Sequence, residues 1–304
     1  MCKSNSIKNI IRKGWKDVHD RGGLTYIEKD NKKLLWEEEG FTFEVNYNPN
    51  RGGYKPSDAI SPWLGNLTEH KTYIMTLDED FTVLANYIPA LEYQILLVST
   101  EYREQHDYTI DEDIRKISRF AEETGIRIFL NSLGTGASVN HLHFQGVFSE
   151  FPLEILPIVK IDENIGYLKG WGGNVLFEGD MDTKLGSLAK TIDKYKNEWP
   201  EADRTIRNDG QKSEIPLFTL LFWEDKILFL PRRRETPSEL GGAKAGGLEV
   251  SGNWIITKED VYANIKAKKI KLMDALREVT FEQAEVNKFF KLHKKEEVKI
   301  ALAV

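Results

Sequence analysis

The sequence predicts an α+β fold of two related halves, each with a largely antiparallel sheet flanked by helices. Two observations support this prediction. Short runs that alternate between apolar and polar residues, or that are apolar throughout, predict strands, and stretches with helical spacing separate them. The order of strand, helix and hairpin found in the first half of the chain recurs in the second. We therefore expect residues 1–150 to form one half and residues 151–304 the other.

The composition is that of an ordinary globular protein. Of the 304 residues, 40% are hydrophobic and 30% are charged, and the formal net charge of −6 gives no positive field to attract nucleic acid. Cys2 is the only cysteine, which argues against a disulfide framework and fits a reducing compartment. The chain has no signal-peptide core and no apolar run of about 18 residues. We expect a cytoplasmic protein that binds neither nucleic acid nor membranes.

The first half begins with a predicted helix and a series of strands. Residues 4–20 carry apolar side chains at helical spacing, which predicts an amphipathic helix packed on the domain. Residues 41–47 alternate and predict a strand. Two further strand-like runs cover residues 72–87, with a turn at 78–80, and residues 91–99.

A helix and a short strand follow before the central motif. Thr109 and Glu112 form a capping-box pattern, and apolar residues at helical spacing continue from there. Gly125 is placed to end this helix. The apolar residues 126–130 then predict a strand that leads directly into the motif.

The chain is organised around residues 131–148. From His141 to Gln145 apolar and polar residues alternate, which predicts a half-buried strand with His141, His143 and Gln145 on one face and a core on the other. The preceding residues 134–138 are rich in glycine and predict a tight loop whose backbone N–H groups suit an anion.

These residue types point to phosphoryl chemistry. Neutral imidazole is a good nucleophile near pH 7 and can form a phosphoramidate, which splits one transfer into two steps. The amide of Gln145 can donate to a phosphate oxygen but cannot protonate a leaving group, which favours transfer to a phosphate or a sugar phosphate over hydrolysis. A pair of structural histidines, or a metal pair, is the alternative. The four other histidines and one cysteine show no spacing that would complete a zinc site.

The motif resembles the active-site signature of the histidine-triad superfamily in its transferase branch. That branch holds the galactose-1-phosphate uridylyltransferases, the diadenosine tetraphosphate phosphorylases and the GDP-hexose phosphorylases. The matching positions are Asn131, Gly136, Ser138, His141, His143 and Gln145. The resemblance implies that His143 is the nucleophile and that His141 orients it. It also implies that Ser138 and Gln145 hold phosphate oxygens, and that Asn131 steadies the loop or the phosphate.

Two upstream positions are candidate substrate contacts. Arg51 and Lys55 lie on a loop rich in turn residues and can clamp a diphosphate, although a solvated surface loop has the same composition. The phosphorylases carry a basic segment at this place, which favours ligand contact for Arg51. By the same resemblance, Asn86 is a candidate for ribose or base contact and Glu92 a weaker one.

The second half repeats the element order without the histidine motif. It contains predicted strands at 175–177, 215–223 and 226–230, a helix at 183–199, and terminal helices at 258–276 and 281–293. Three consecutive arginines, residues 232–234, predict a solvated face or a phosphate contact. Residues 239–252 form a glycine-rich loop. Residues 248–260 are similar to a segment of GDP-hexose phosphorylases. The transferase branch has one catalytic and one degenerate half, here residues 1–150 and 151–304.

The resemblance implies a nucleotidyltransferase acting as a phosphorylase on a nucleoside diphosphate sugar of the GDP-hexose type. Its partners would be that nucleotide and inorganic phosphate, and a homodimer is possible. The alternatives are a dinucleoside polyphosphate phosphorylase or hydrolase and, from another class, a nucleotide-binding sensor without turnover. No cofactor is certain. Phosphates often bring Mg²⁺, but the sequence shows no carboxylate cluster that must hold it and no other metal site.

Overall fold

A computed structural model describes residues 2–25, 31–51, 62–63, 65–201, 205–206 and 213–292, with the side chains from residue 6 onward. The loop that carries Arg51 continues into residues 52–61, so the predicted contact of Lys55 lies outside the described residues. The end of the predicted helix at 281–293 lies outside them as well. No helix in the described ranges is long and apolar enough to cross a membrane.

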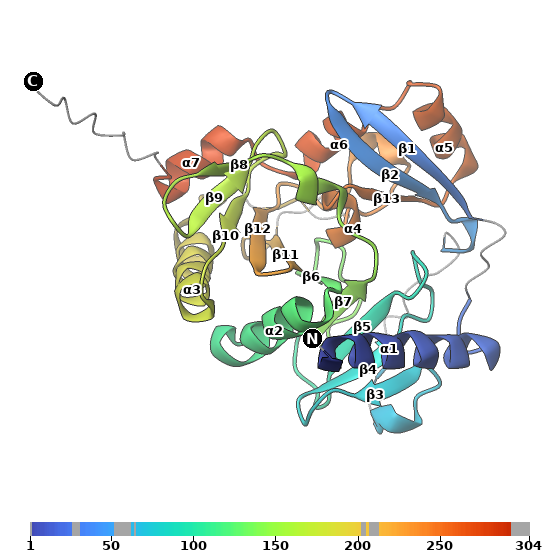
Figure 1. The fold of residues 1–304 in the computed structure, drawn as a ribbon. Coiled ribbons are helices and arrows are strands. Elements are labelled where there is room, and N and C mark those ends of the chain that lie inside the picture. Colours follow the sequence, from blue (N-terminus) through green and yellow to red (C-terminus); the bar gives the residue numbers. More distant parts are fainter. Residues whose placement is uncertain are drawn as a thin grey trace, which may run out of the picture.

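A sheet of ten strands of different lengths runs through the described part of the molecule (Figure 1). Its strands, in spatial order, are β3 (Tyr73–Thr76), β4 (Phe81–Ala85), β5 (Ile95–Ser99), β7 (His143–Val147), β6 (Arg127–Asn131), β11 (Phe218–Trp223), β12 (Lys226–Pro231), β10 (Val175–Phe177), β9 (Ile165–Leu168) and β8 (Ile158–Lys160). All neighbouring pairs are antiparallel. The prediction of largely antiparallel sheets in an α+β fold is confirmed.

The ten strands consist of two runs with the same topology. The first run is β3, β4, β5, helix α2 (Arg115–Thr124), β6 and β7, with spatial order β3-β4-β5-β7-β6. The second is β8, β9, β10, helix α3 (Met181–Glu198), β11 and β12, with spatial order β8-β9-β10-β12-β11. The runs join where β6 pairs with β11. The two halves are therefore related, as predicted, although the division at residue 150 into separate domains stays a prediction.

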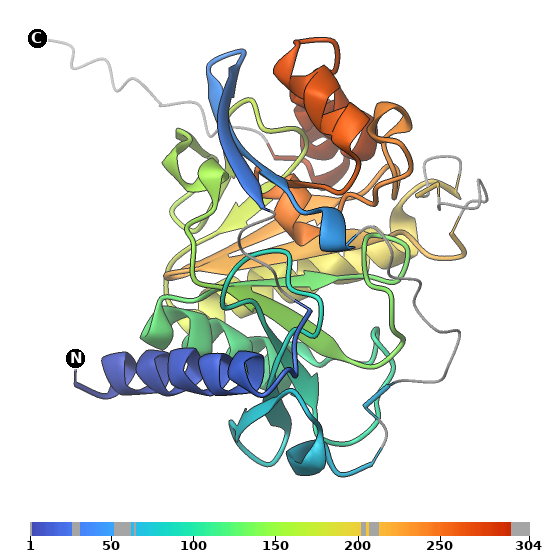
Figure 2. The same ribbon diagram turned by 90° about the vertical axis from the view of Figure 1, so that its right-hand side faces the viewer.

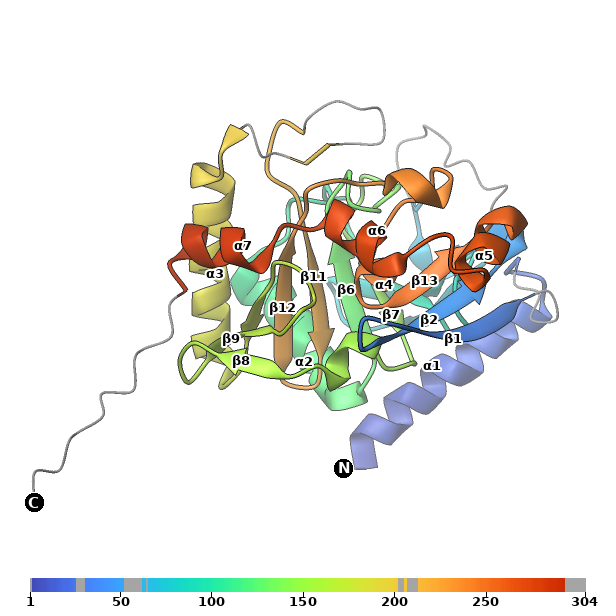
Figure 3. The same cartoon turned by 90° about the horizontal axis from the view of Figure 1, so that it is seen from above.

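Helices cover one face of the sheet. Helix α1 (Cys2–Asp20), α2 and α3 pack there together with α7 (Gln283–Phe290) (Figures 1 and 3). The apolar stripe of α1 is buried as its spacing predicts, with Ile11, Trp15 and Val18 in the core of this face. Leu142 and Phe144, which flank His143, lie in the same core. Burial of these side chains holds β7 flat against the helical layer.

A second layer covers the opposite face and combines segments from the early and late parts of the chain (Figure 2). The hairpin β1 (Lys32–Glu38) and β2 (Phe41–Tyr47) pairs through β2 with the parallel strand β13 (Asn253–Ile256). Helices α4 (Gly247–Val250), α5 (Glu259–Lys266) and α6 (Leu272–Val279) complete the layer. The active-site cavity lies where this layer meets β7 and its neighbours.

Several local predictions hold and two need correction. Gly125 ends α2 in the left-handed region with φ of 64°. The side chain of Thr109 accepts from the backbone of Asp113 rather than Glu112, because the helix opens with one π-helical turn that shifts the first free N–H by one residue. The predicted helix at 258–276 is two helices, α5 and α6, separated by residues 267–271.

Candidate active site

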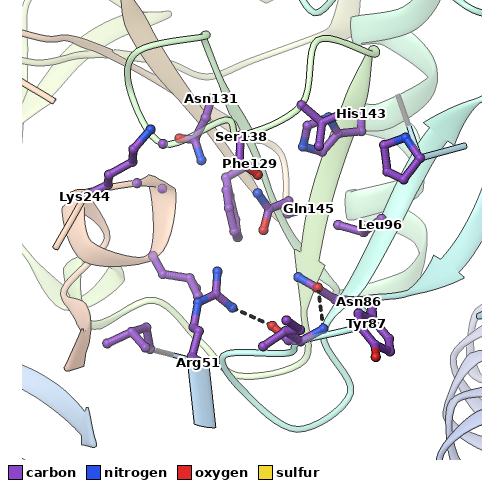
Figure 4. A pocket seen from close by; sticks show the side chains of 18 of the residues that line it. Arg51, Asn86, Tyr87, Leu96, Phe129, Asn131, Ser138, His143, Gln145 and Lys244 are labelled. Carbon is purple, nitrogen blue, oxygen red and sulfur yellow. Dashed lines mark hydrogen bonds between the residues drawn. The ribbon is translucent and has the colours of Figure 1, made fainter. Parts of the chain in front are cut away.

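A cavity of about 570 Å³ lies at the start of β7. Its wall is built from the motif loop, the ends of β4 and β5, the Arg51 loop and the glycine-rich segment that leads into α4. Seven of the predicted site residues line it: Arg51, Asn86, Asn131, Gly136, Ser138, His143 and Gln145. In Figure 4 the side chains of Asn131, Ser138 and Gln145 surround the space beside His143, while Arg51 enters from the opposite end. Segments far apart in the sequence thus meet in one site.

The catalytic strand has the predicted period but begins later than expected. His143 is the first residue of β7 and Gln145 follows on the same face of the strand. His141 precedes the strand, and its ring does not reach the described cavity wall. Its Nε2 atom lies 3.0 Å from the carbonyl oxygen of Ser99 on β5. His143 and Gln145 share the face that lines the cavity, as predicted, whereas the ring of His141 lies outside the described lining and packs against Trp63.

The contacts of His143 fix its tautomer. Its Nδ1 atom lies 2.7 Å from the backbone carbonyl of His141. A carbonyl can only accept, so Nδ1 carries the hydrogen and Nε2 keeps its lone pair. Burial lowers the pKa of His143 to about 4, which leaves the ring neutral at pH 7. The oriented neutral imidazole that a nucleophile requires is therefore present. His141 orients it through its main chain.

Trp63 closes the other side of the two histidines. Its ring meets that of His143 edge-on at 5.1 Å and that of His141 at 5.6 Å between centroids. Aromatic contacts of this geometry stabilise the ring positions and exclude water. Burial also lowers the pKa of His141, so neither ring is charged near neutral pH. No sequence pattern predicted this position for Trp63, since only the fold brings it to the motif.

The amide of Gln145 is oriented by a chain of hydrogen bonds. Gln94 on the loop before β5 is fully buried and donates through Nε2 to Oε1 of Gln145 over 2.9 Å. The orientation of Gln94 is itself set by the backbone N–H of Ala90, which donates to Oε1 over 2.6 Å. With its oxygen engaged, Gln145 presents its NH₂ group to the cavity. That is the donor a phosphate oxygen needs.

A second chain of hydrogen bonds orients Asn131. Arg232 is fully buried and donates over 3.0 Å to the hydroxyl of Thr219, which donates over 3.3 Å to Oδ1 of Asn131. The NH₂ group of Asn131 is thereby left for the cavity side. Arg232 also donates to the carbonyl of Ala245 over 2.6 Å and so holds the glycine-rich segment in place. Burial lowers its pKa to about 10, so the group stays charged at neutral pH.

Of the arginine run at 232–234, only Arg232 is fully buried, and none of the three lines the described cavity. Arg233 and Arg234 keep part of their side chains exposed, and Arg233 pairs with Glu285 at 2.7 Å while Arg234 pairs with Glu278. These ion pairs connect the end of β12 to α7 and α6. The prediction of a solvated face is therefore wrong for Arg232, because the sequence alone does not show that this residue turns inward under the glycine-rich segment.

Two glycine segments approach each other at the end of the cavity beside Asn131. Gly136 has φ of +117°, and a Cβ atom there would lie 2.7 Å from the Cα of Gly246. A Cβ on Gly247 would lie 2.3 Å from the ring of Phe129. Only glycine allows this approach. Residues 134–138 therefore form the tight loop predicted from sequence, and the second segment is its partner.

The predicted upstream contacts also reach the cavity. Arg51 is half-buried, lines the cavity and donates to the carbonyl of Ile88 over 2.8 Å, which favours ligand contact over a solvated position for this residue (Figure 4). Burial lowers its pKa, and the charge of Glu249 partly offsets this. Asn86 accepts from the backbone of Ile88 over 3.2 Å, which directs its NH₂ group outward. Glu92 is exposed and is not part of the described cavity wall.

Lys244 is a further cavity residue that the sequence analysis did not predict. It lies on the glycine-rich segment and pairs with Glu235 at 2.7 Å. Figure 4 shows its side chain across the cavity from His143, beside Asn131. A lysine among glycines was the available signal, because such segments often bind phosphate. In the described ranges no group of three or more histidine, cysteine or carboxylate residues comes together to hold a metal.

Comparisons with known proteins agree with this geometry. The sequence profile of the Ap4A phosphorylase N-terminal domain matches residues 3–161. Yeast Ap4A phosphorylase Apa2 has a similar structure, with TM-score 0.68 and 15% identity over 90% of this chain and 94% of that one. Its complex with Ap4A gives TM-score 0.67 and 13% identity over 90% and 97%. The search of curated sequences found no match. The structural likeness shows the fold, and the profile covers more than half of the chain. The chain therefore belongs to the Ap4A phosphorylase N-terminal domain family, within the histidine-triad superfamily, and is a nucleotidyltransferase of the phosphorylase type.

Proposed function

We propose that this protein cleaves a dinucleoside polyphosphate by phosphorolysis through a covalent nucleotide on His143. The main support for this proposal is the state of the His143 imidazole. It is buried and neutral, and its Nδ1–H faces the carbonyl of His141, so that Nε2 keeps its lone pair for attack. The lone pair of Nε2 attacks the α-phosphorus, and the bond to the bridging oxygen breaks. The leaving nucleotide takes the electron pair. An oxygen of inorganic phosphate then attacks the same phosphorus, the P–N bond breaks, and a nucleoside diphosphate leaves.

The surrounding groups have distinct tasks in this proposal. The NH₂ groups of Gln145 and Asn131 donate to the non-bridging oxygens of the α-phosphate, where charge builds up during attack. The hydroxyl of Ser138 and the backbone of the Gly136 loop bind the adjacent phosphate. Lys244 neutralises the outgoing polyphosphate. No group is required to protonate the leaving group, because a phosphate oxygen leaves as an anion.

Strand geometry supports the proposal that the amide of Gln145 assists His143 rather than His141. Residues i and i+2 on one strand face lie about 6–7 Å apart, from the rise of about 3.3 Å per residue. An amide two positions from the nucleophile reaches oxygens on a phosphorus bonded to its neighbour. From His141 the same amide would be about twice as far.

A nucleoside diphosphate sugar of the GDP-hexose type is the second candidate substrate. Residues 248–260 are similar to a segment of GDP-hexose phosphorylases, and four residues of this stretch line the cavity: Leu248, Glu249, Ile255 and Thr257. The family assignment favours the dinucleotide, and this stretch favours the sugar nucleotide. Both share the same first step, attack of His143 on an α-phosphorus.

A substrate screen separates these possibilities. Dinucleoside polyphosphates and nucleotide sugars of each base are incubated with and without inorganic phosphate, and with and without Mg²⁺, and the released nucleotides are quantified. The proposal expects a nucleoside diphosphate that appears only with phosphate. Nucleoside monophosphate formed at the same rate without phosphate would instead support a hydrolase. Tight binding without any product would support a sensor.

Matched histidine variants connect the screen to the site. His143→Asn removes the nucleophile and should abolish turnover with every substrate. His19→Asn on the exposed end of α1 is the control and should leave turnover unchanged. Turnover that persists in His143→Asn would contradict the proposed covalent route.

A further inference from the structure

The two strands behind the active site separate where the nucleophile begins. β6 and β7 are paired at Arg127↔Val147, Ile128↔Gly146 and Phe129↔Gln145. Continuing this register would place Asn131 opposite His143. There the pairing between the two strands has ended, although β6 remains paired with β11 through Asn131↔Thr219. The backbone groups of Asn131 and His143 therefore need another partner.

The side chain of Gln105 fills this gap. Its Oε1 accepts from the backbone N–H of His143 over 3.0 Å. Its Nε2 donates to the carbonyl of His143 over 3.0 Å and to the carbonyl of Asn131 over 2.9 Å. Gln105 is 1% exposed, so water does not compete for these bonds. One amide thus replaces the strand pair that the sheet lacks at this point.

The segment that carries Gln105 is itself held firmly. The N–H of Leu142 donates to the carbonyl of Arg103 over 2.7 Å, and the N–H of Gln105 donates to the side chain of Asn140 over 3.0 Å. Arg103 makes a bidentate pair with Asp113 at 2.8 and 2.9 Å, which connects the segment to the start of the helical layer. The amide is therefore a fixed spacer between the two strands.

We propose that Gln105 is a positioning residue that sets the distance between His143 and Asn131. The backbone of His143 is held by Gln105, and its ring is held by the carbonyl of His141. Without the amide, three buried backbone groups lose their partner, and the nearest new partner of the His143 N–H is the carbonyl of Asn131. The ends of β6 and β7 would then move together, and the ring of His143 would shift relative to the side-chain amide of Asn131. The inference rests on the proposed function of His143 as the nucleophile.

Gln105→Met tests the proposal, because methionine has nearly the same length but makes no hydrogen bond. A shift of about 1 Å in a reacting group costs about 100-fold in rate, so kcat and the rate of adduct formation should fall by about that factor while KM changes little. Gln105→Glu keeps the acceptor for the N–H of His143 but places a carboxylate against two carbonyls. In this variant kcat and the rate of adduct formation should fall by a similar factor.

Gln283→Met is the matched control. Gln283 also binds one residue through both backbone groups, accepting from the N–H of Asn174 over 3.0 Å and donating to its carbonyl over 3.0 Å. It lies at the start of α7, and the described cavity wall does not include it. A comparable fall in Tm with unchanged kcat is expected for this variant. If kcat of Gln283→Met fell as much as kcat of Gln105→Met, general destabilisation would explain the loss of activity in both variants and the proposal would be wrong.

A readout without substrate separates this proposal from the proposed function. Diethyl pyrocarbonate modifies the free nitrogen of neutral imidazole, and mass spectrometry reports its rate at His143. We expect this rate to change in both Gln105 variants and not in Gln283→Met, even if the wild-type protein shows no phosphorolysis. Wild-type kcat and wild-type His143 reactivity in Gln105→Met would overturn the proposal. Loss of folding in both Gln105 variants, with Gln283→Met folded, would also overturn it by making Gln105 a residue for stability alone.

Discussion

The acid limb of the activity profile tests the buried state of His143. Nucleophilic attack requires the neutral ring, so the reaction slows when the ring gains a proton. Burial lowers the pKa of His143 to about 4, because the charged form loses its hydration inside the protein. The carbonyl of His141 opposes this shift only in part. The protein should therefore remain active well below the pH at which ordinary histidines become charged.

The expected difference is large at pH 5. A group with a pKa of about 4 is about 90% neutral there. An imidazole with the ordinary pKa of about 6.5 would be only about 3% neutral. The first half-reaction at pH 5 should thus keep about nine-tenths of its rate at pH 7, and kcat/KM should fall only as the pH approaches 4.

The assay is single-turnover formation of the labelled adduct without inorganic phosphate. Omitting phosphate matters because phosphate titrates near neutral pH, whereas the internal phosphates of a dinucleotide do not. Circular dichroism at each pH confirms that the protein stays folded. A tenfold or greater loss of adduct rate between pH 7 and pH 5 in folded protein, as an unperturbed imidazole would give, would refute the assignment of a buried neutral nucleophile.

Three substitutions test other parts of the site. Arg51→Ala should raise KM by about tenfold or more and lower kcat less, because a lost charged hydrogen bond in uniform binding acts on KM; an unchanged KM would mean that Arg51 only holds its loop. Gly136→Ala should lower Tm and nucleotide affinity more than Gly65→Ala, since both have positive φ but only Gly136 faces a backbone atom at 2.7 Å; calorimetry that gives equal losses would argue against the close approach of the two loops. Lys244→Met should raise KM for a polyphosphate by about tenfold with little change in kcat, and titration calorimetry showing unchanged binding would remove Lys244 from the substrate site.

The sequence predicted most of the site because its motif is local. Strand periodicity and turn chemistry placed His143, Gln145 and the glycine-rich loop, and the resemblance to the transferase-branch motif added Asn131 and Ser138. The faces of His143 and Gln145 followed from the period of two. Membership in the transferase branch of the histidine-triad superfamily is confirmed by the family profile and the fold.

The parts that sequence reasoning missed depend on long-range pairing. Strand β13 pairs in parallel with β2 across about two hundred residues of chain, and no local pattern announces such a pair. Lys244 reaches the cavity from the glycine-rich segment before α4, and Trp63 reaches it by packing beside β4 and β5. The roles of Gln94 and Gln105 were not predicted either, because a single glutamine has no periodic signature. Arg232 was predicted as part of a solvated face or a phosphate contact, since a run of arginines is usually solvated.

The orientation of His143 changes one part of the sequence interpretation. The resemblance implied that His141 orients the nucleophile, and the structure assigns this contact to the backbone carbonyl of His141. Replacement of the His141 side chain would leave that carbonyl in place. The ring of His141 instead packs between Trp63 and Tyr102 and reaches Ser99. Its loss should loosen the wall behind the nucleophile without removing the attacking group.

Mapping of the covalent nucleotide tests directly whether His143 is the nucleophile. The protein is incubated with α-labelled dinucleotide or nucleotide sugar in the absence of phosphate, digested, and analysed for an acid-labile, base-stable label typical of a phosphoramidate. We expect the wild-type protein to carry the label on His143. The label should be absent from His143→Ala and should still form, more slowly, in His141→Ala. A label on His141, or one that survives in His143→Ala, would contradict it.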